Sequence, residues 1–252
     1  MTRSLEPLLK RLLLHGALKE TDQTAVLTLP NAVQLLEPGQ YVVREGDRPT
    51  HSCLVISGFA IRHKIGVDGK RQIVNVHMSG DMVDLQNSLL TIADHNVQAL
   101  TNLCAAFIPR EALVDLAFSR PAVGKALWIE TLIEGSIARE WIMNVGRRDA
   151  QRRLGHLLCE FAHRLDAVDL GPECNYELPM TQDDLADAAG LTSVHVNRSL
   201  KALDEAGLVR RNRRSVTITD LPQLAKFADF RSLYLHLPAR ALPSHLRAEA
   251  LA

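Results

Sequence analysis

The pattern of apolar and turn-forming residues changes at Pro121, and this change limits the chain to a fold with a β-rich first part and a long helix after it. Beyond Pro121 an apolar residue recurs every four positions: Ile129, Ile133, Ile137, Trp141 and Val145. This spacing predicts one helix over 121–146. Its apolar face is broader than a single contact needs, so we expect it to cover its own domain and also the same helix of a second copy. Burial wholly within one chain is the alternative.

Before Pro121, from about Leu36 to Phe107, short β-prone runs alternate with turn residues. The runs are YVV at 41, CLVI at 53, FAIRHKI at 59, QIVNV at 72 and AAF at 105. Several short strands at this spacing predict a small antiparallel β-barrel or sandwich. A leucine-rich run, Leu12 to Leu14, precedes them. Charged residues flank this run closely, so we expect an amphipathic helix and neither a signal peptide nor a membrane span.

Beyond the long helix, the sequence predicts a second helix from about Asp149 to Leu165, a connector from Asp169 to Tyr176, and then two short helices joined by a turn at Gly190. Thr181 followed by Asp184 predicts the cap of the first short helix, and Thr192 predicts the cap of the second. Two helices arranged in this way form a helix-turn-helix.

The second short helix is expected to turn its apolar residues inward and to leave an open polar face. The residues on that face are Ser193, Val194, Asn197 and Arg198. A helix of this kind fits the major groove of DNA, so we predict that these four residues contact bases. Arg198 is the principal candidate, because a guanidinium can donate two parallel hydrogen bonds to guanine O6 and N7.

Contacts to the DNA backbone are predicted at the helix starts and on a basic hairpin, or wing, that follows. The candidates are Thr181, Gln182, Thr192, Arg210, Arg211, Arg213 and Arg214. The 29 Lys and Arg residues balance 29 Asp and Glu residues, so any affinity for DNA must come from a local patch of this kind. A solvated charged turn is the alternative.

With these motifs the chain resembles the Crp-Fnr family, the bacterial regulators related to the cyclic AMP receptor protein. Leu178 to Arg210 resembles the family's helix-turn-helix. The glycine pattern of its sensor barrel matches Gly39, Glu45-Gly46-Asp47, Ser57-Gly58, Asp68-Gly69 and Gly80-Asp81. By this resemblance, Arg198 occupies the family's base-contacting arginine position, and Val194 replaces a frequent glutamate.

The resemblance implies an α+β fold in which an N-terminal antiparallel β-barrel, jelly-roll type and cyclic-nucleotide-binding-like, is joined by a dimerisation helix to a C-terminal winged helix-turn-helix. We expect a sensor domain at 1–120, the helix at 121–146, the DNA-binding domain at 147–222 and an extension at 223–252. The expected partners are double-stranded DNA with a palindromic site, a second copy of the chain and RNA polymerase, with no membrane.

Family members that bind cyclic nucleotides hold the ribose with a glutamate and the phosphate with an Arg-Ser pair. Counted from Gly80 without gaps, Leu85 stands in place of the glutamate, and His95-Asn96 stand in place of Arg-Ser. A phosphate in a dry cavity needs a permanent positive charge or several donors, so we predict no tight binding of cyclic AMP. A cyclic-nucleotide-responsive regulator with atypical residues at the ribose and phosphate positions is the alternative. Asp84, Leu85, His95 and Asn96 are the candidate pocket residues for an unidentified effector.

No cofactor, metal site or catalytic activity is predicted. The four cysteines are widely spaced and none precedes Cys53, which favours reduced thiols in the cytoplasm and disfavours an N-terminal iron-sulfur centre. For His77 and His95 we prefer a structural role to haem ligation. For His156, Cys159 and His163 we prefer a structural role to metal ligation. The sequence has no His-x-His, Gly-x-Ser-x-Gly, P-loop or dinucleotide fingerprint, so we expect no enzyme.

Overall fold

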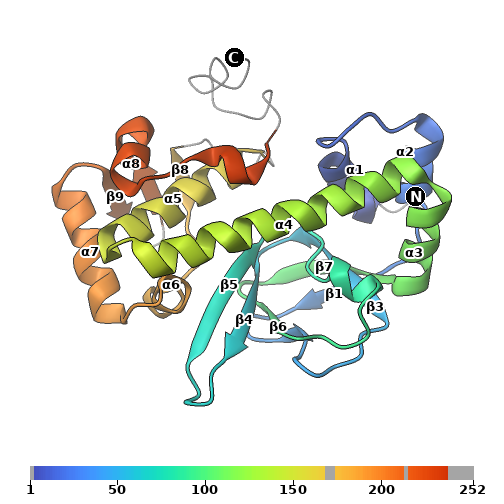
Figure 1. The fold of residues 1–252 in the computed structure, drawn as a ribbon, viewed down its shortest axis with the longest axis horizontal. Coiled ribbons are helices and arrows are strands. Elements are labelled where there is room, and N and C mark those ends of the chain that lie inside the picture. The colour runs from blue at the N-terminus through green and yellow to red at the C-terminus, as the bar shows by residue number, and fades with distance from the viewer. Residues whose placement is uncertain (1–2, 168–173, 213–214, 238–252) are drawn as a thin grey trace. The chain divides into compact units, whose positions relative to one another are not determined.

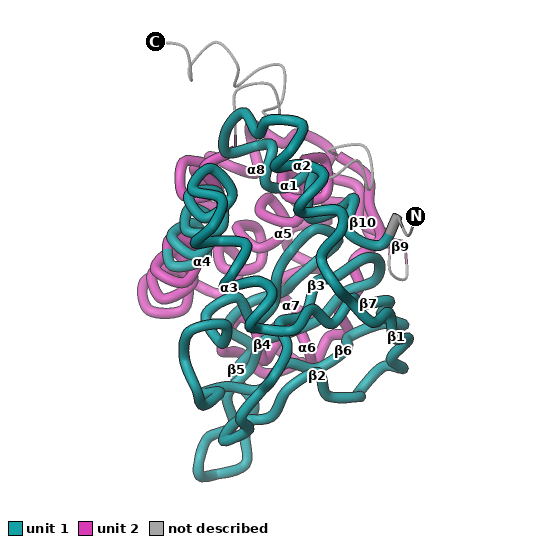
Figure 2. The backbone as a smooth tube through the Cα atoms, turned by 90° about the vertical axis from the view of Figure 1, so that its right-hand side faces the viewer, with its two compact units in different colours: residues 1–135 teal, residues 136–252 magenta. Residues whose placement is uncertain are grey.

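The computed structural model describes residues 3–167, 174–212 and 215–237, and the chain divides into two compact units. Figure 2 colours them separately, as residues 1–135 (unit 1) and 136–252 (unit 2). The division falls inside α4 (Pro121–Arg147), the long helix that the apolar repeat predicts (Figure 1). No helix in the described part of the chain is both long enough and apolar enough to cross a bilayer.

Unit 1 is a two-sheet β structure with helices at both ends of its sequence (Figure 1). Its elements before α4 are η1 (Arg3–Leu5), α1 (Glu6–Leu12), α2 (Glu20–Leu27), β1 (Ala32–Leu36), β2 (Tyr41–Val43), β3 (His51–Ser57), β4 (Ala60–Ile65), β5 (Arg71–His77), η2 (Leu85–Ser88), β6 (Asn96–Ala99), β7 (Leu103–Pro109) and α3 (Arg110–Ser119). The five predicted runs correspond to β2, β3, β4, β5 and β7. The runs did not predict β1 and β6.

The strands of unit 1 pair antiparallel in two sheets, with the orders β1-β7-β3 and β2-β6-β4-β5. Side chains from both sheets, such as Val55 and Ala105 from one and Val97 and Ala99 from the other, share one apolar core. The jelly-roll-type fold class is confirmed, but the described strands form two separate sheets and do not close into one barrel.

An amphipathic helix is present at the start of the chain as α1, but it ends at Leu12, and Leu13 and Leu14 of the predicted run lie in the turn after it. Leu5, Leu8 and Leu12 are almost fully buried, and they share a core with Leu54 of β3 and Ile108 of β7. Burial of each leucine contributes about 1.5–3 kcal/mol, which fixes α1 onto the β structure of unit 1.

Unit 2 is built around α5 (Ala150–Ala167), which the second predicted helix matches closely. The elements that follow are β8 (Asn175–Glu177), α6 (Gln182–Ala189), α7 (Ser193–Glu205), β9 (Val209–Asn212), β10 (Ser215–Ile218), α8 (Leu221–Ala228) and η3 (Ser232–Leu235). Helices α6, α7 and α8 all contact α5, and the small antiparallel sheet has the order β8-β10-β9. Most of the predicted connector, 168–173, lies outside the described residues.

The chain after the wing is part of the core of unit 2. Sequence analysis places residues 223–252 in an extension, but α8 packs closely on α5: a Cβ added at Gly155 would lie 3.1 Å from the Cβ of Ala228. Leu224 and Leu235 are buried there. The wing is therefore followed by a packed helix and turn up to residue 235.

Candidate nucleic-acid interface

The first helix of the predicted motif begins with the predicted cap. The hydroxyl of Thr181 accepts a hydrogen bond from the backbone N–H of Asp184 (3.1 Å), and the Asp184 carboxylate accepts one from the backbone N–H of Thr181 (3.0 Å). This reciprocal pair satisfies two donors that the first turn of α6 would otherwise leave open. Gly190 ends α6 at φ 62°, in the left-handed region that favours glycine, and this conformation turns the chain into α7.

Helix α7 buries one face and exposes the other, as the sequence predicts. The hydroxyl of Thr192 caps it by accepting from the backbone N–H of His195. Val196, Leu200 and Leu203 are buried against the rest of unit 2. The helix is thereby held by its apolar side, with its N-terminal turn open to a partner.

The four predicted base-contacting residues lie together on the first turns of α7. Val194, Asn197 and Arg198 are exposed, and Ser193 is half-buried. The hydroxyl of Ser193 donates a hydrogen bond to the carboxylate of Asp183 in α6. Ser193 is therefore engaged within the motif, whereas Asn197 and Arg198 extend from the exposed face.

One exposed residue of this face was missed by sequence reasoning. His195 lies on the first turn of α7, and its imidazole contacts the Thr192 hydroxyl at 3.2 Å. Its two neighbours in the sequence, Val194 and Val196, are both apolar and gave no sign that it would be exposed. Successive residues of a helix point in different directions, so an exposed residue can stand next to a buried one. A polar imidazole therefore joins the open face.

The backbone-contact candidates at the helix starts are also exposed. The hydroxyl of Thr181 donates to Asp184 (2.7 Å) in addition to accepting the capping bond, so its hydrogen-bonding capacity is largely used. Gln182 and Thr192 are exposed as well. Asp183 is exposed on the same turn of α6, and its negative charge opposes a phosphate placed there.

The predicted wing is the hairpin of β9 and β10. Arg210 pairs with Thr217 and Arg211 with Val216 across the ladder, and β8 adds a third strand. Arg210 is exposed. Arg211 is half-buried, and burial lowers the pKa of its guanidinium, which nonetheless stays charged at neutral pH. The other two candidates of the wing tip, Arg213 and Arg214, lie outside the described residues.

Two of the four effector-pocket candidates meet in unit 1. The imidazole of His95 contacts the Asp84 carboxylate at 3.3 Å and the Asp94 carboxylate at 2.6 Å, and the amide of Gln86 lies 3.3 Å from the same ring. Asp84 and His95 are buried. The hydrogen bond from His95 is the main reason why the pKa of Asp94 is lowered. Both ring nitrogens of His95 therefore already have partners within the chain.

The other two candidates point to different surroundings. Leu85 belongs to the apolar core that α1, α3 and α4 share. Asn96 accepts a hydrogen bond from the backbone N–H of Glu45 at 3.1 Å. The four residues are thus near one another in the chain but do not form a single pocket.

Charged side chains also occupy the space between α4 and the rest of unit 1. Arg62 of β4 donates to the carboxylate of Glu134 and to the carbonyl oxygen of Val83. Arg11 of α1 donates to Glu130 at 2.8 Å. These contacts link α4 to unit 1 through groups of the chain itself.

The residues considered as metal ligands on α5 have other contacts. Nε2 of His156 lies 3.1 Å from the Glu140 carboxylate, and its ring stacks on Tyr234. His163 contacts the backbone carbonyl of Cys159 at 2.9 Å. Across the described residues, no three His, Cys, Asp or Glu side chains converge as a metal site would require.

Two family models match separate parts of the chain. The model of the Crp-like helix-turn-helix domain matches residues 152–227, and that of the cyclic nucleotide-binding domain matches 33–120. The transcriptional activator protein FnrL of Cereibacter sphaeroides is 30% identical over 214 residues, which cover 83% of this chain and 85% of FnrL. The nitrogen fixation regulation protein FixK of Azorhizobium caulinodans is 30% identical over 156 residues, 62% of each protein. The solved structure of FixK2 from Bradyrhizobium japonicum has a TM-score of 0.72 at 24% identity and covers 79% of this chain and 97% of its own.

Proposed function

The chain belongs to the Crp-Fnr family of DNA-binding transcription regulators, and from this premise we propose that it binds a palindromic DNA site as a homodimer under the control of an effector. The exposed N-terminal face of α7 is the observation that carries the proposal. It presents Asn197 and Arg198 from a helix that Thr192 caps and that a buried apolar face fixes. A major groove admits such a helix, and guanine offers the two acceptors that a guanidinium matches.

The backbone contacts in the proposal come from around that helix. In the proposal, Gln182 and Thr192, which are exposed at the starts of α6 and α7, contact phosphates, and Arg210 and Arg211 of the wing supply positive charge. These contacts would position the protein without reading sequence. Arg213 and Arg214 are retained as candidates from the sequence alone.

The dimer in the proposal forms through α4. Trp128, Leu132, Gly135, Arg139 and Ile142 follow one another at alternating spacings of four and three, which is the heptad spacing of a two-helix contact. All of them except Gly135 are exposed in the single chain. A second α4 would cover this stripe, and the two-fold symmetry of such a dimer would match a palindromic site.

RNA polymerase is the further partner we propose, because FnrL is named a transcriptional activator. A cyclic-nucleotide-responsive regulator is not favoured, since the relatives are of the FnrL and FixK type. The region of Asp84 and His95, where a cyclic phosphate would need a free cation, holds carboxylates instead. Members of this family are regulators and not enzymes.

The proposal is tested by replacing Arg198 with alanine and measuring binding to the palindrome selected by the wild-type protein. We expect a loss of about 1–3 kcal/mol on the palindrome and little change on random DNA, with relaxed preference at one base pair in each half-site. Fluorescence anisotropy with labelled duplexes measures both.

Two matched variants separate the roles. Lys201→Ala removes another exposed cation of α7, one that pairs with Glu205, and should leave the base preference intact. Arg210→Ala should weaken binding to all sequences alike and reduce its salt dependence. An equal loss on palindromic and random DNA for Arg198→Ala would contradict the assignment of base contact.

A further inference from the structure

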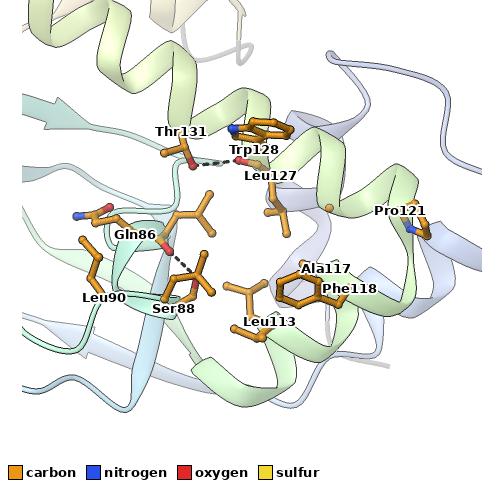
Figure 3. Close-up of a pocket in the computed structure, with 14 residues that line it drawn as sticks. Gln86, Ser88, Leu90, Leu113, Ala117, Phe118, Pro121, Leu127, Trp128 and Thr131 are labelled. Atoms are coloured by element: carbon orange, nitrogen blue, oxygen red, sulfur yellow. Dashed lines mark hydrogen bonds between the residues drawn. The ribbon is translucent and has the colours of Figure 1, made fainter.

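A cavity of about 550 Å³ lies in unit 1 between η2, α3 and the first part of α4 (Figure 3). Leu85 and the residues that follow it form one wall, Leu113 to Phe118 form the second, and Pro121 to Thr131 form the third. The volume is in the range of small-molecule sites, about 300–1,000 Å³. This cavity is large enough for a ligand and is built from three different elements.

The lining of the cavity is apolar and carries no charge. None of the fourteen residues that line it, all of them within the described part of the chain, is acidic, basic or histidine. The hydroxyl of Ser88 donates to the carbonyl of Leu85 at 2.7 Å, and the hydroxyl of Thr131 donates to the carbonyl of Leu127 at 3.2 Å, as Figure 3 shows. A charged ligand would lose its hydration here without gaining an opposite charge.

The rim of the cavity exposes large apolar side chains. Leu89, Leu90, Phe118 and Trp128 line it and are each 57–76% exposed. Single exposed apolar residues are ordinary, but several of them around one hollow mark a binding site. Aromatic rings lie on two different walls, Trp128 on α4 and Phe118 on α3.

We propose that this cavity binds an uncharged, largely apolar small molecule, and that the bound molecule regulates the protein through α4. A concave site of this volume without charged groups fits such a molecule, whereas a cyclic nucleotide or another phosphate would be excluded by desolvation. Gln86, which lines the cavity, also contacts the imidazole of His95 through its amide nitrogen at 3.3 Å.

The route to regulation is the shared use of α4. Trp128 lines the cavity and also belongs to the exposed stripe through which we propose the dimer forms. A ligand packed on Trp128 and Leu127 changes the surface offered to the second copy. The regulatory half of the proposal, that the ligand acts through α4, rests on the proposed function. The binding half, that the cavity takes up a ligand, rests on the cavity alone.

Binding is tested on the full-length protein with two related fluorescent probes. N-phenyl-1-naphthylamine is uncharged, and 8-anilinonaphthalene-1-sulfonate has the same ring system with a sulfonate. We expect saturable binding of one uncharged probe per chain, and binding of the sulfonate at least about tenfold weaker. Absence of saturable binding, or equal affinity for the two probes, would overturn the proposal.

Substitutions assign the probe to this cavity. Leu90→Asp places a charge on the rim, and Ile92→Asp makes the same change at an exposed residue that does not line the cavity. Val114→Phe fills the cavity without adding charge. We expect the dissociation constant of the uncharged probe to rise at least about tenfold for Leu90→Asp and Val114→Phe, and less than twofold for Ile92→Asp. Circular dichroism checks the fold of each variant, and equal effects of all three substitutions would refute the site.

Two further measurements separate the possible outcomes. If a second copy covers the cavity, probe binding weakens as rising protein concentration drives dimerisation, and this result overturns the proposal. If the probe shifts the affinity for the palindromic DNA by at least about threefold in the wild type but not in Val114→Phe, the regulatory half is supported; an unchanged affinity refutes that half. A protein that binds no palindrome at all would refute the proposed function, and the probe titration would still decide whether the cavity binds.

Discussion

Replacing Tyr234 with phenylalanine removes one hydroxyl from a buried cluster in unit 2. That hydroxyl donates to Oε2 of Glu160 at 2.7 Å, and Glu160 is only 1% exposed. The same carboxylate accepts from the indole N–H of Trp141 (3.0 Å) and from Arg164 (3.2 Å). The ring of Tyr234 stacks on His156, a contact that phenylalanine retains. The substitution therefore tests the hydrogen bond and leaves the packing in place.

We expect Tyr234→Phe to lower the free energy of unfolding by about 2 kcal/mol. A hydrogen bond to a charged group contributes about 1.5–3 kcal/mol, and Glu160 keeps two other donors, which places the loss in the lower part of this range. Urea unfolding followed by circular dichroism and by tryptophan fluorescence measures the loss. The fluorescence of Trp141, which shares the carboxylate, reports on the cluster itself.

A double-mutant cycle with Glu160→Gln isolates the pair, because Tyr234→Phe should cost less once the carboxylate charge is gone. Tyr41→Phe is the matched control. The Tyr41 ring lies under the Arg44 guanidinium, a contact that phenylalanine keeps, and we expect a change within about 0.5 kcal/mol. Equal losses for the two tyrosine variants, or no coupling in the cycle, would refute the reasoning.

The same hydroxyl gives stability a dependence on pH. Burial, and next the neighbouring Glu160 carboxylate, raise the pKa of Tyr234 well above its ordinary value of 10.0. The folded protein therefore holds this proton more tightly than the unfolded chain does. The resulting stability is present below about pH 10 and is lost as the pH rises towards the folded value. Burial raises the pKa of Tyr176 in the same direction. We expect the stability of Tyr234→Phe to fall less steeply above pH 10, but not to become flat.

Three more outcomes follow from particular residues. Gly58→Ala should destabilise the protein by more than about 2 kcal/mol in urea unfolding, because Gly58 has φ +86° and an added Cβ would lie 2.2 Å from the carbonyl oxygen of Asn102. Gly190→Ala should lower the free energy of unfolding by only about 1–2 kcal/mol, because alanine can adopt the left-handed φ of 62° at a moderate cost. A larger loss for Gly190→Ala than for Gly58→Ala would contradict this reasoning. Cys174 is exposed, whereas Cys53 is buried, and burial together with the nearby charge of Asp84 raises the pKa of the Cys53 thiol. An aromatic disulfide reagent at neutral pH should therefore label Cys174 quickly and Cys53 only on unfolding, which peptide mass spectrometry measures.

The helix-turn-helix could be predicted from the sequence because its signals are local. The cap of α6 needs only Thr181 and Asp184, three residues apart, and the turn needs a glycine at residue 190. Each of these acts within one turn of the backbone, so tertiary context does not override it. The long helix after Pro121 could also be predicted, because the same spacing of apolar residues persists along the whole of α4.

Contacts between distant segments were not predictable in this way. Asp84 and His95 were chosen by position in the sequence, and only the fold shows that the two residues pair with each other while Leu85 turns into the apolar core. Ser193 was expected to face DNA, yet its hydroxyl donates to Asp183, ten residues away on the preceding helix. Tyr234 gave no signal at all, because its partner is 74 residues earlier in the chain.

Two ion pairs link α4 to unit 1 close in sequence to the residues that line the cavity. Glu130 and Glu134 lie one turn apart and pair with Arg11 and Arg62, so α4 is linked to unit 1 without any ligand. The two carboxyl groups differ in the direction in which their pKa values shift. Burial raises the pKa of each carboxyl, but for Glu130 the attraction of Arg11 and His15 outweighs burial, whereas for Glu134 burial outweighs the attraction of Arg62. The neighbouring residues of α4 line the cavity, so the ligand that we propose there would contact a helix that these ion pairs already link to unit 1.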